Sequence, residues 1–133
     1  MATLDKVKAI AEYDGWELRG EPEFIPPYKI WVKQLPSGTK LIPYISPSGK
    51  EYDNWIKDMK YLTSLDWLHP VALRVLNNLV SEFNISTKFN TYVCASDHIA
   101  NIKKAMYKPP VNGEYIDLFN AVYDGIIFLN SNK

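Results

Sequence analysis

The most regular hydrophobic pattern in the chain runs from Leu68 to Phe83. Apolar residues recur there at helical spacing, and polar residues occupy the opposite side. The apolar set is Leu68, Val71, Ala72, Val75, Leu76, Leu79 and Phe83, and the polar set is Arg74, Asn77, Asn78 and Glu82. This pattern predicts an amphipathic α-helix that packs its apolar side on a core.

Pro70 and its neighbours stand at the start of this pattern, in the segment YLTSLDWLHPVALRVL. Proline has no N–H to donate, which costs little only near the start of a helix. The regular helix is therefore predicted to begin close to Pro70, after a looser turn that Ser64 or Asp66 caps and under which Trp67 packs. We interpret these residues as a helix entrance and a structural signature rather than as a catalytic group with His69.

Three further segments show helical spacing of apolar residues. The first begins at a capping Thr3 and ends at the Asp-Gly turn at residues 14–15. A second, short helix is predicted to begin at the Ser-Asp pair at residues 96–97, and Pro109 ends it. The last covers residues 114–129. Its apolar side is wide, so we expect another part of the fold to pack on it. A glycine inside this helix costs about 1 kcal/mol relative to alanine.

Strand patterns occupy other parts of the chain. Four segments alternate apolar and polar residues or are rich in β-branched and aromatic ones, namely Trp16–Arg19, Tyr28–Lys33, Lys40–Ile45 and Lys88–Cys94. Pro43 cannot donate to a strand ladder, which predicts an edge or a bulge there. Residues 51–63 are compatible with a helix or with a short strand over residues 59–62.

These patterns together predict an α+β fold. We expect one domain over residues 1–133, with a small, mostly antiparallel sheet of about four strands and helices on one or both faces, in the manner of an α/β/α sandwich. No repeat, low-complexity tract or internal linker divides the chain.

The charge balance and the cysteine content limit the classes of function. Lys plus Arg and Asp plus Glu both number 15, so we expect no non-specific binding to nucleic acid. The single Cys94 permits no intramolecular disulfide, and no charged leader followed by an apolar run opens the chain. The longest apolar runs are far shorter than the roughly 20 residues of a membrane-spanning helix. The prediction is a cytoplasmic protein that does not act in a membrane.

No catalytic or metal-binding constellation stands out. Cys94 and His98 are four residues apart, but a strand that ends at Cys94 and a helix that begins near His98 would not place them face to face. One cysteine and two histidines could complete a structural zinc site only with carboxylates or across subunits, and the carboxylates are scattered. We therefore expect no enzyme, no metal and no cofactor.

Aromatic and basic residues mix in the strand-rich half of the chain. The candidate ligand-binding residues are Trp31, Lys33, Lys40, Tyr44, Lys50, Tyr52 and Trp55. Alternation puts Trp31 between lysines on the face opposite Ile30 and Val32, where it could form a stacking platform for a nucleobase with phosphates. The alternative is that helices cover this face and the lysines only extend their ends to water.

The segment TSLDWLHPVALRVL resembles the Thr-Ser-Trp-Asp-Trp-Leu-Met-Pro-Val-Val segment of a group of small phage and prophage proteins, the phage α-β-α (ABA) sandwich group. The opening KVKAIAEYDGW and the closing YIDLFNAVYDGIIFLNSNK are similar to the first and last helices of that group. The chain departs from the group at Leu65 and His69, where tryptophan and methionine are usual, and in a longer stretch around residues 103–113. The resemblance implies a three-layer sandwich and an accessory role in phage or mobile-element biology, and it supplies no catalytic residue.

Two functions follow as expectations. The first is a non-enzymatic, cytoplasmic binding protein of phage or mobile-element origin, a host-defence antagonist that sequesters a small anionic, nucleotide-like ligand and forms a homo-oligomer. The alternative is a protein–protein adaptor or inhibitor that binds a host protein through exposed aromatics around Tyr52, Trp55 and Tyr61.

Overall fold

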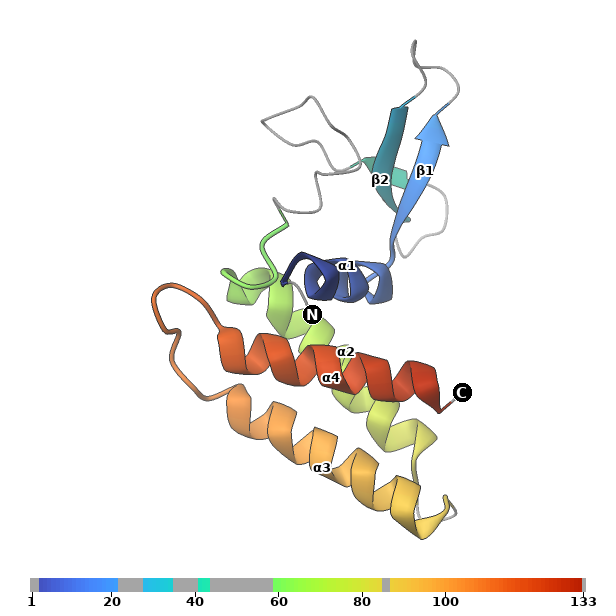
Figure 1. Ribbon diagram of the computed structural model, residues 1–133, viewed down its shortest axis with the longest axis vertical. Helices are drawn as coiled ribbons and strands as arrows, with labels where there is room; N and C mark the ends of the chain where they lie inside the picture. The colour runs from blue at the N-terminus through green and yellow to red at the C-terminus, as the bar shows by residue number, and fades with distance from the viewer. Residues whose placement is uncertain (1–2, 22–27, 35–40, 44–58, 85–86, 133) are drawn as a thin grey trace. The chain divides into compact units, whose positions relative to one another are not determined.

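The computed structural model describes residues 3–21, 28–34, 41–43, 59–84 and 87–132 (Figure 1). Contacts divide the chain into two compact units, Met1–Met59 and Lys60–Lys133. The elements in chain order are α1 (Thr3–Tyr13), β1 (Trp16–Glu21), β2 (Tyr28–Gln34), β3 (Leu41–Pro43), α2 (Leu65–Glu82), α3 (Phe89–Ala105) and α4 (Ile116–Ser131). A single domain over residues 1–133 stays a prediction.

Helix α1 opens the N-terminal unit, as its apolar spacing predicts. Val7, Ile10 and Ala11 are buried. The helix ends where the Asp14 amide donates to the Ile10 carbonyl, and Gly15 follows with φ 104°. A backbone angle in this region suits glycine because it has no Cβ, so the predicted Asp-Gly stop is confirmed.

The strands of this unit form an antiparallel sheet in the order β1-β2-β3. The register pairs Trp16 with Lys33 at one end of β1 and Glu21 with Tyr28 at the other. Pro43 pairs with Val32 and lies in the edge strand β3. The three predicted strands in this part of the chain are confirmed, and Pro43 lies in the strand at the edge of the described sheet, as predicted.

The C-terminal unit is helical. Helices α2, α3 and α4 each pack against the other two, and α3 and α4 run antiparallel (Figure 1). Outside these helices, its described residues form turns and one isolated bridge between Val111 and Glu114. The predicted strand alternative over residues 59–62 is wrong, because residues 61–63 form a turn.

The predicted α/β/α sandwich with about four strands is wrong, and so is the three-layer fold that the phage resemblance implies. Most of the described residues are helical, and residues 89–94, expected as a strand, are the first turns of α3. The predicted helix start at residues 96–97 is too late for the same reason. Ala95, Ile102 and Ala105 share the buried side of α3, so tertiary packing along this helix overrides the local strand preference of Phe89 to Val93.

The predicted apolar stripe of α2 is confirmed as core of this unit, and that of α4 is confirmed except at Ile116 and Ile127, which are exposed. In α2 the buried residues are Leu68, Val71, Ala72, Val75, Leu76 and Leu79. In α4 they are Leu118, Phe119, Val122, Tyr123, Gly125, Ile126 and Leu129. Gly125 is therefore a core position of the helix rather than a weak point in it.

Candidate functional site

The predicted ligand-binding residues fall mainly outside the described residues, and Lys40, Tyr44, Lys50, Tyr52 and Trp55 all do. Trp31 and Lys33 lie two positions apart on strand β2. Their register partners on β1 are Leu18 and Trp16. The sheet therefore carries the first two candidates on one strand, and a ligand site there stays a prediction.

The helix that contains Pro70 begins earlier in the chain than predicted. Helix α2 begins at Leu65, more than a turn before Pro70, with Ser64 as its N-cap. The Ser64 side chain makes no capping bond, and its backbone carbonyl accepts from the amides of Trp67 and Leu68. The prediction that the helix begins close to Pro70 is wrong. Proline at this position leaves the carbonyl of Asp66 without its usual i+4 donor.

Trp67 packs as a structural residue, as predicted. Its ring meets the edge of the Tyr61 ring at a centroid distance of 5.2 Å and an interplanar angle of 88°. Tyr61 has no exposed surface, so it cannot serve as an exposed anchor for a partner. The amide of Tyr115 donates to the carbonyl of Leu62 and ties this entrance to the start of α4. Next to it, Leu65, Asp66, His69 and Pro70 line an open depression of about 300 Å³.

Cys94 and His98 are four residues apart on one helix and therefore on the same side of it, so their predicted separation by a strand end and a helix start is wrong. Both lie on α3, where the thiol of Cys94 is exposed. The His98 ring packs on Phe128 of α4 at a centroid distance of 4.9 Å, and Phe128 also contacts Phe83 at 4.9 Å. Among the described residues, no group of three or more His, Cys, Asp or Glu side chains could hold a metal ion.

A second shallow depression lies between α3 and α4. Its lining residues are His98, Tyr123, Asp124, Ile127, Phe128 and Ser131, and its volume is about 380 Å³. Pockets for small molecules enclose most of the ligand surface. This depression is open to solvent, so it suits a contact with a larger surface better than the enclosure of a small ligand.

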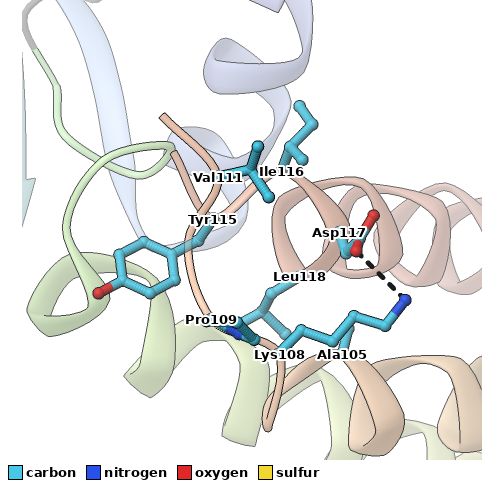
Figure 2. Close-up of a pocket in the computed structure, with 8 residues that line it drawn as sticks. All are labelled: Ala105, Lys108, Pro109, Val111, Tyr115, Ile116, Asp117 and Leu118. Atoms are coloured by element: carbon cyan, nitrogen blue, oxygen red, sulfur yellow. Dashed lines mark ion pairs between the residues drawn. The ribbon is translucent and has the colours of Figure 1, made fainter. Parts of the chain in front are cut away.

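The connection between α3 and α4 forms a tight hairpin. Val111 and Glu114 exchange two backbone hydrogen bonds of 2.9 and 3.0 Å, around Asn112 with φ 53° and Gly113 with φ 78°. Two positive φ values with an Asn-Gly pair are typical of a type I′ turn. Figure 2 shows the base of this connection, where Lys108 Nζ pairs with Asp117 Oδ2 at 3.2 Å.

The largest group of exposed apolar side chains on the helices belongs to α2 and α3. We call Leu73, Val80, Phe89, Tyr92 and Val93 the α2–α3 surface. Their exposed fractions range from 39% for Val93 to 77% for Phe89. Large apolar side chains that gather on a surface mark contact sites more often than single ones do.

Helical geometry turns the residues of the α2–α3 surface away from α4. On α3, His98 faces α4, and Tyr92 lies about 120° around the helix from it. On α2, Val75 approaches Gly125 of α4, and Val80 lies about 140° around the helix from Val75. Helices α2 and α3 pack against each other, and we take their exposed apolar residues together as one candidate site.

Sequence reasoning missed this surface, although part of its signal is present in the chain. Leu73 and Val80 are seven residues apart and lie off the buried stripe of α2, so they mark a second apolar side. The β-branched and aromatic content around Phe89, Tyr92 and Val93 predicts a strand instead. In a helix, Tyr92 and Val93 lie three and four residues after Phe89, so all three side chains share one side.

Three comparisons give no relative for the chain, since no family model, no curated protein and no solved structure matches it. In the parts of the chain that the structure describes, no helix has both the length and the apolarity needed to cross a bilayer.

Proposed function

We propose that the protein is a non-enzymatic binding protein that docks a partner protein on the α2–α3 surface. The observation that carries this proposal is the exposure of Leu73, Val80, Phe89, Tyr92 and Val93 on two packed helices. Aromatic side chains on such a surface supply most of the binding free energy in protein interfaces. The open depressions of the helical unit support a protein partner over an enclosed small molecule.

The setting that we propose is the cytoplasm of a host cell, with the protein acting as an accessory factor of a phage or mobile element. The resemblance in the segment from Thr63 to Leu76 supports this origin. The single cysteine supports a compartment without disulfides. A host protein is then the natural partner.

The test is capture of a host protein from lysate on the immobilised full chain. Phe89→Ala combined with Tyr92→Ala should reduce capture at least about tenfold, because both residues are exposed anchors. Tyr107→Ala is the matched control, because Tyr107 is 89% exposed but lies after α3, outside the surface. Undiminished capture by the double variant, with unchanged circular dichroism, would refute the proposal.

A second candidate function is the sequestration of a small anionic, nucleotide-like ligand by the sheet. The observation that favours it is the placement of Trp31 and Lys33 at alternate positions of β2. Thermal-shift measurements with cyclic nucleotides and ADP-ribose derivatives test it. A bound ligand at 100 times its Kd stabilises a fold by about 2.7 kcal/mol. No shift with any of these ligands, or equal shifts in Trp31→Ala, would exclude this function.

A further inference from the structure

An asparagine or aspartate precedes a glycine at three places in the chain, namely Asp14-Gly15, Asn112-Gly113 and Asp124-Gly125. In such a pair the backbone nitrogen of the glycine can attack the side-chain carbonyl carbon and close a five-membered cyclic imide. Glycine favours this reaction because it has no Cβ to shield its amide and its backbone rotates most freely. The sequence therefore offers three candidate positions for a spontaneous change in the chain.

The fold engages the glycine amide in two of these pairs. The Gly15 amide donates to the Glu12 carbonyl at 3.1 Å. Gly125 is buried inside α4, where each amide donates to the carbonyl four residues earlier. A nitrogen held in such a bond cannot reach the preceding side chain until that part of the helix opens.

The Asn112-Gly113 pair differs from both. Among the described residues, no group accepts from the Gly113 amide, and the two bonds of the hairpin instead join Val111 and Glu114. Asn112 and Gly113 are exposed, and no other part of the described chain lies within 4 Å of the place that a Cβ on Gly113 would occupy. The attacking nitrogen and the side-chain amide of this pair are thus both accessible.

Opening of the hairpin sets the pace of the reaction. In a type I′ turn the first central residue has a ψ of about 30°, and ring closure requires rotation about this bond to bring the Gly113 nitrogen to Cγ of Asn112. The two backbone hydrogen bonds between Val111 and Glu114 oppose that rotation. Such a turn opens at a small fraction of the free energy of global unfolding. Cyclisation is therefore slower in the folded chain than in an unfolded one, but it does not require the helical core to open.

We propose that Asn112 is a site of spontaneous deamidation. The Gly113 nitrogen bonds to Cγ of Asn112, the bond from Cγ to Nδ2 breaks, and ammonia leaves with the proton of the Gly113 amide. Water then adds to one of the two carbonyl carbons of the imide, which yields aspartate or isoaspartate at position 112. Water is the only co-reactant that the sequence of steps needs. The inference goes beyond the proposed function and does not depend on the α2–α3 surface.

Isoaspartate at position 112 changes the connection between α3 and α4. Its main chain contains one additional carbon atom, so the two central residues no longer fit a two-residue turn that closes between Val111 and Glu114. The product also adds a carboxylate two residues before that of Glu114. Conversion is therefore expected to leave the hairpin open in a fraction of the molecules that rises with age.

The test is incubation of the full chain in native buffer, followed by peptide mapping and labelling with an isoaspartyl methyltransferase. Asn112 should convert at least about tenfold faster than any asparagine within α2, α3 or α4, because those residues require local unfolding of a helix. Asp14 and Asp124 should yield no isoaspartate over the same period. The chain in concentrated urea should convert Asn112 faster than the native chain, since no turn opposes ring closure there.

Asn112→Gly is the matched control, because glycine keeps the left-handed backbone and has no side chain that can cyclise. With age, the unaltered chain should lose thermal stability in proportion to its isoaspartate content, whereas this variant should not. An Asn112 that stays intact in the native chain while the chain in urea converts fully would overturn the proposal. So would isoaspartate that appears first at Asp14 or Asp124, or an equal loss of stability in the aged variant.

Discussion

Gly125 of α4 lies directly against Val75 of α2. A Cβ atom on Gly125 would come within 2.9 Å of Val75 Cγ1 and 3.2 Å of Ile102 Cδ1 of α3. Gly125 is thus the point at which all three helices of the C-terminal unit meet. Helix propensity alone disfavours glycine here, and the close approach of α2 and α3 explains why this position has no side chain.

Gly125→Ala is expected to lower the free energy of unfolding by up to about 2 kcal/mol. The added methyl group overpacks the core, and this cost exceeds the gain in helix propensity of about 1 kcal/mol. Urea unfolding followed by circular dichroism measures the change. Ala121→Gly is a control on the same helix, because it should lose only the propensity term; a more stable Gly125→Ala would show that the helices shift apart freely.

A double-mutant cycle isolates the contact between Gly125 and Val75. Val75→Ala alone removes buried methyl groups and should destabilise the protein. In the Gly125→Ala background the same substitution also removes the closest atom, so its cost should fall by at least about 0.5 kcal/mol. Strict additivity of the two changes would mean that Val75 is not the residue that opposes a methyl group at position 125.

Gly113→Ala should destabilise the hairpin between α3 and α4 by about 1–2 kcal/mol. Gly113 has φ 78°, which disfavours any residue with a Cβ, although nothing lies within 4 Å of the added atom. The loss of stability therefore comes from the backbone conformation. Asn112 has φ 53°, which glycine adopts more easily, so Asn112→Gly should be neutral or slightly stabilising. Equal effects of the two variants in thermal unfolding would contradict the type I′ turn.

Pro70→Ala should stabilise α2 by about 1–2 kcal/mol. Pro70 lies within the helix, where it removes a backbone hydrogen bond, and it is exposed rather than packed. Alanine restores the donor to the Asp66 carbonyl, which outweighs the greater entropy of the unfolded chain. Chemical unfolding tests this expectation. A destabilised Pro70→Ala variant would show that the proline itself positions the helix entrance.

Tyr61 and Trp67 should be energetically coupled. Tyr61 is fully buried and meets Trp67 edge to face, so Tyr61→Ala should cost about 3–5 kcal/mol. The coupling energy between Tyr61→Leu and Trp67→Leu should be about 0.5–1.5 kcal/mol. Leucine keeps most of the apolar volume at both positions. A coupling near zero would assign the stability of this entrance to burial alone.

Part of the fold could be predicted from local patterns. The stripe from Leu68 to Phe83, the closing apolar helix and the alternating strand at Tyr28 each reflect a period that one element imposes on its own residues. Pro43 at an edge and Gly15 after a helix follow from backbone chemistry in the same way.

The candidate site could not be predicted in the same way. Phe89, Tyr92 and Val93 have strand-forming side chains, yet they lie on the outside of α3 because Ala95 and Ile102 hold the inner side of that helix in the core. Their exposure depends on which helices cover α3. No local pattern reports that.

The sequence by itself determined where periodic helices and strands form and where glycine and proline end or bend them, because these effects act within a few residues. It also determined that Cys94 cannot be part of an intramolecular disulfide. Only the tertiary structure decided that residues 89–94 are helical and that Gly125 stands where three helices meet. It also decided that the apolar residues of the α2–α3 surface face solvent. Burial results from contacts between distant segments, and these contacts exist only once the helices have packed.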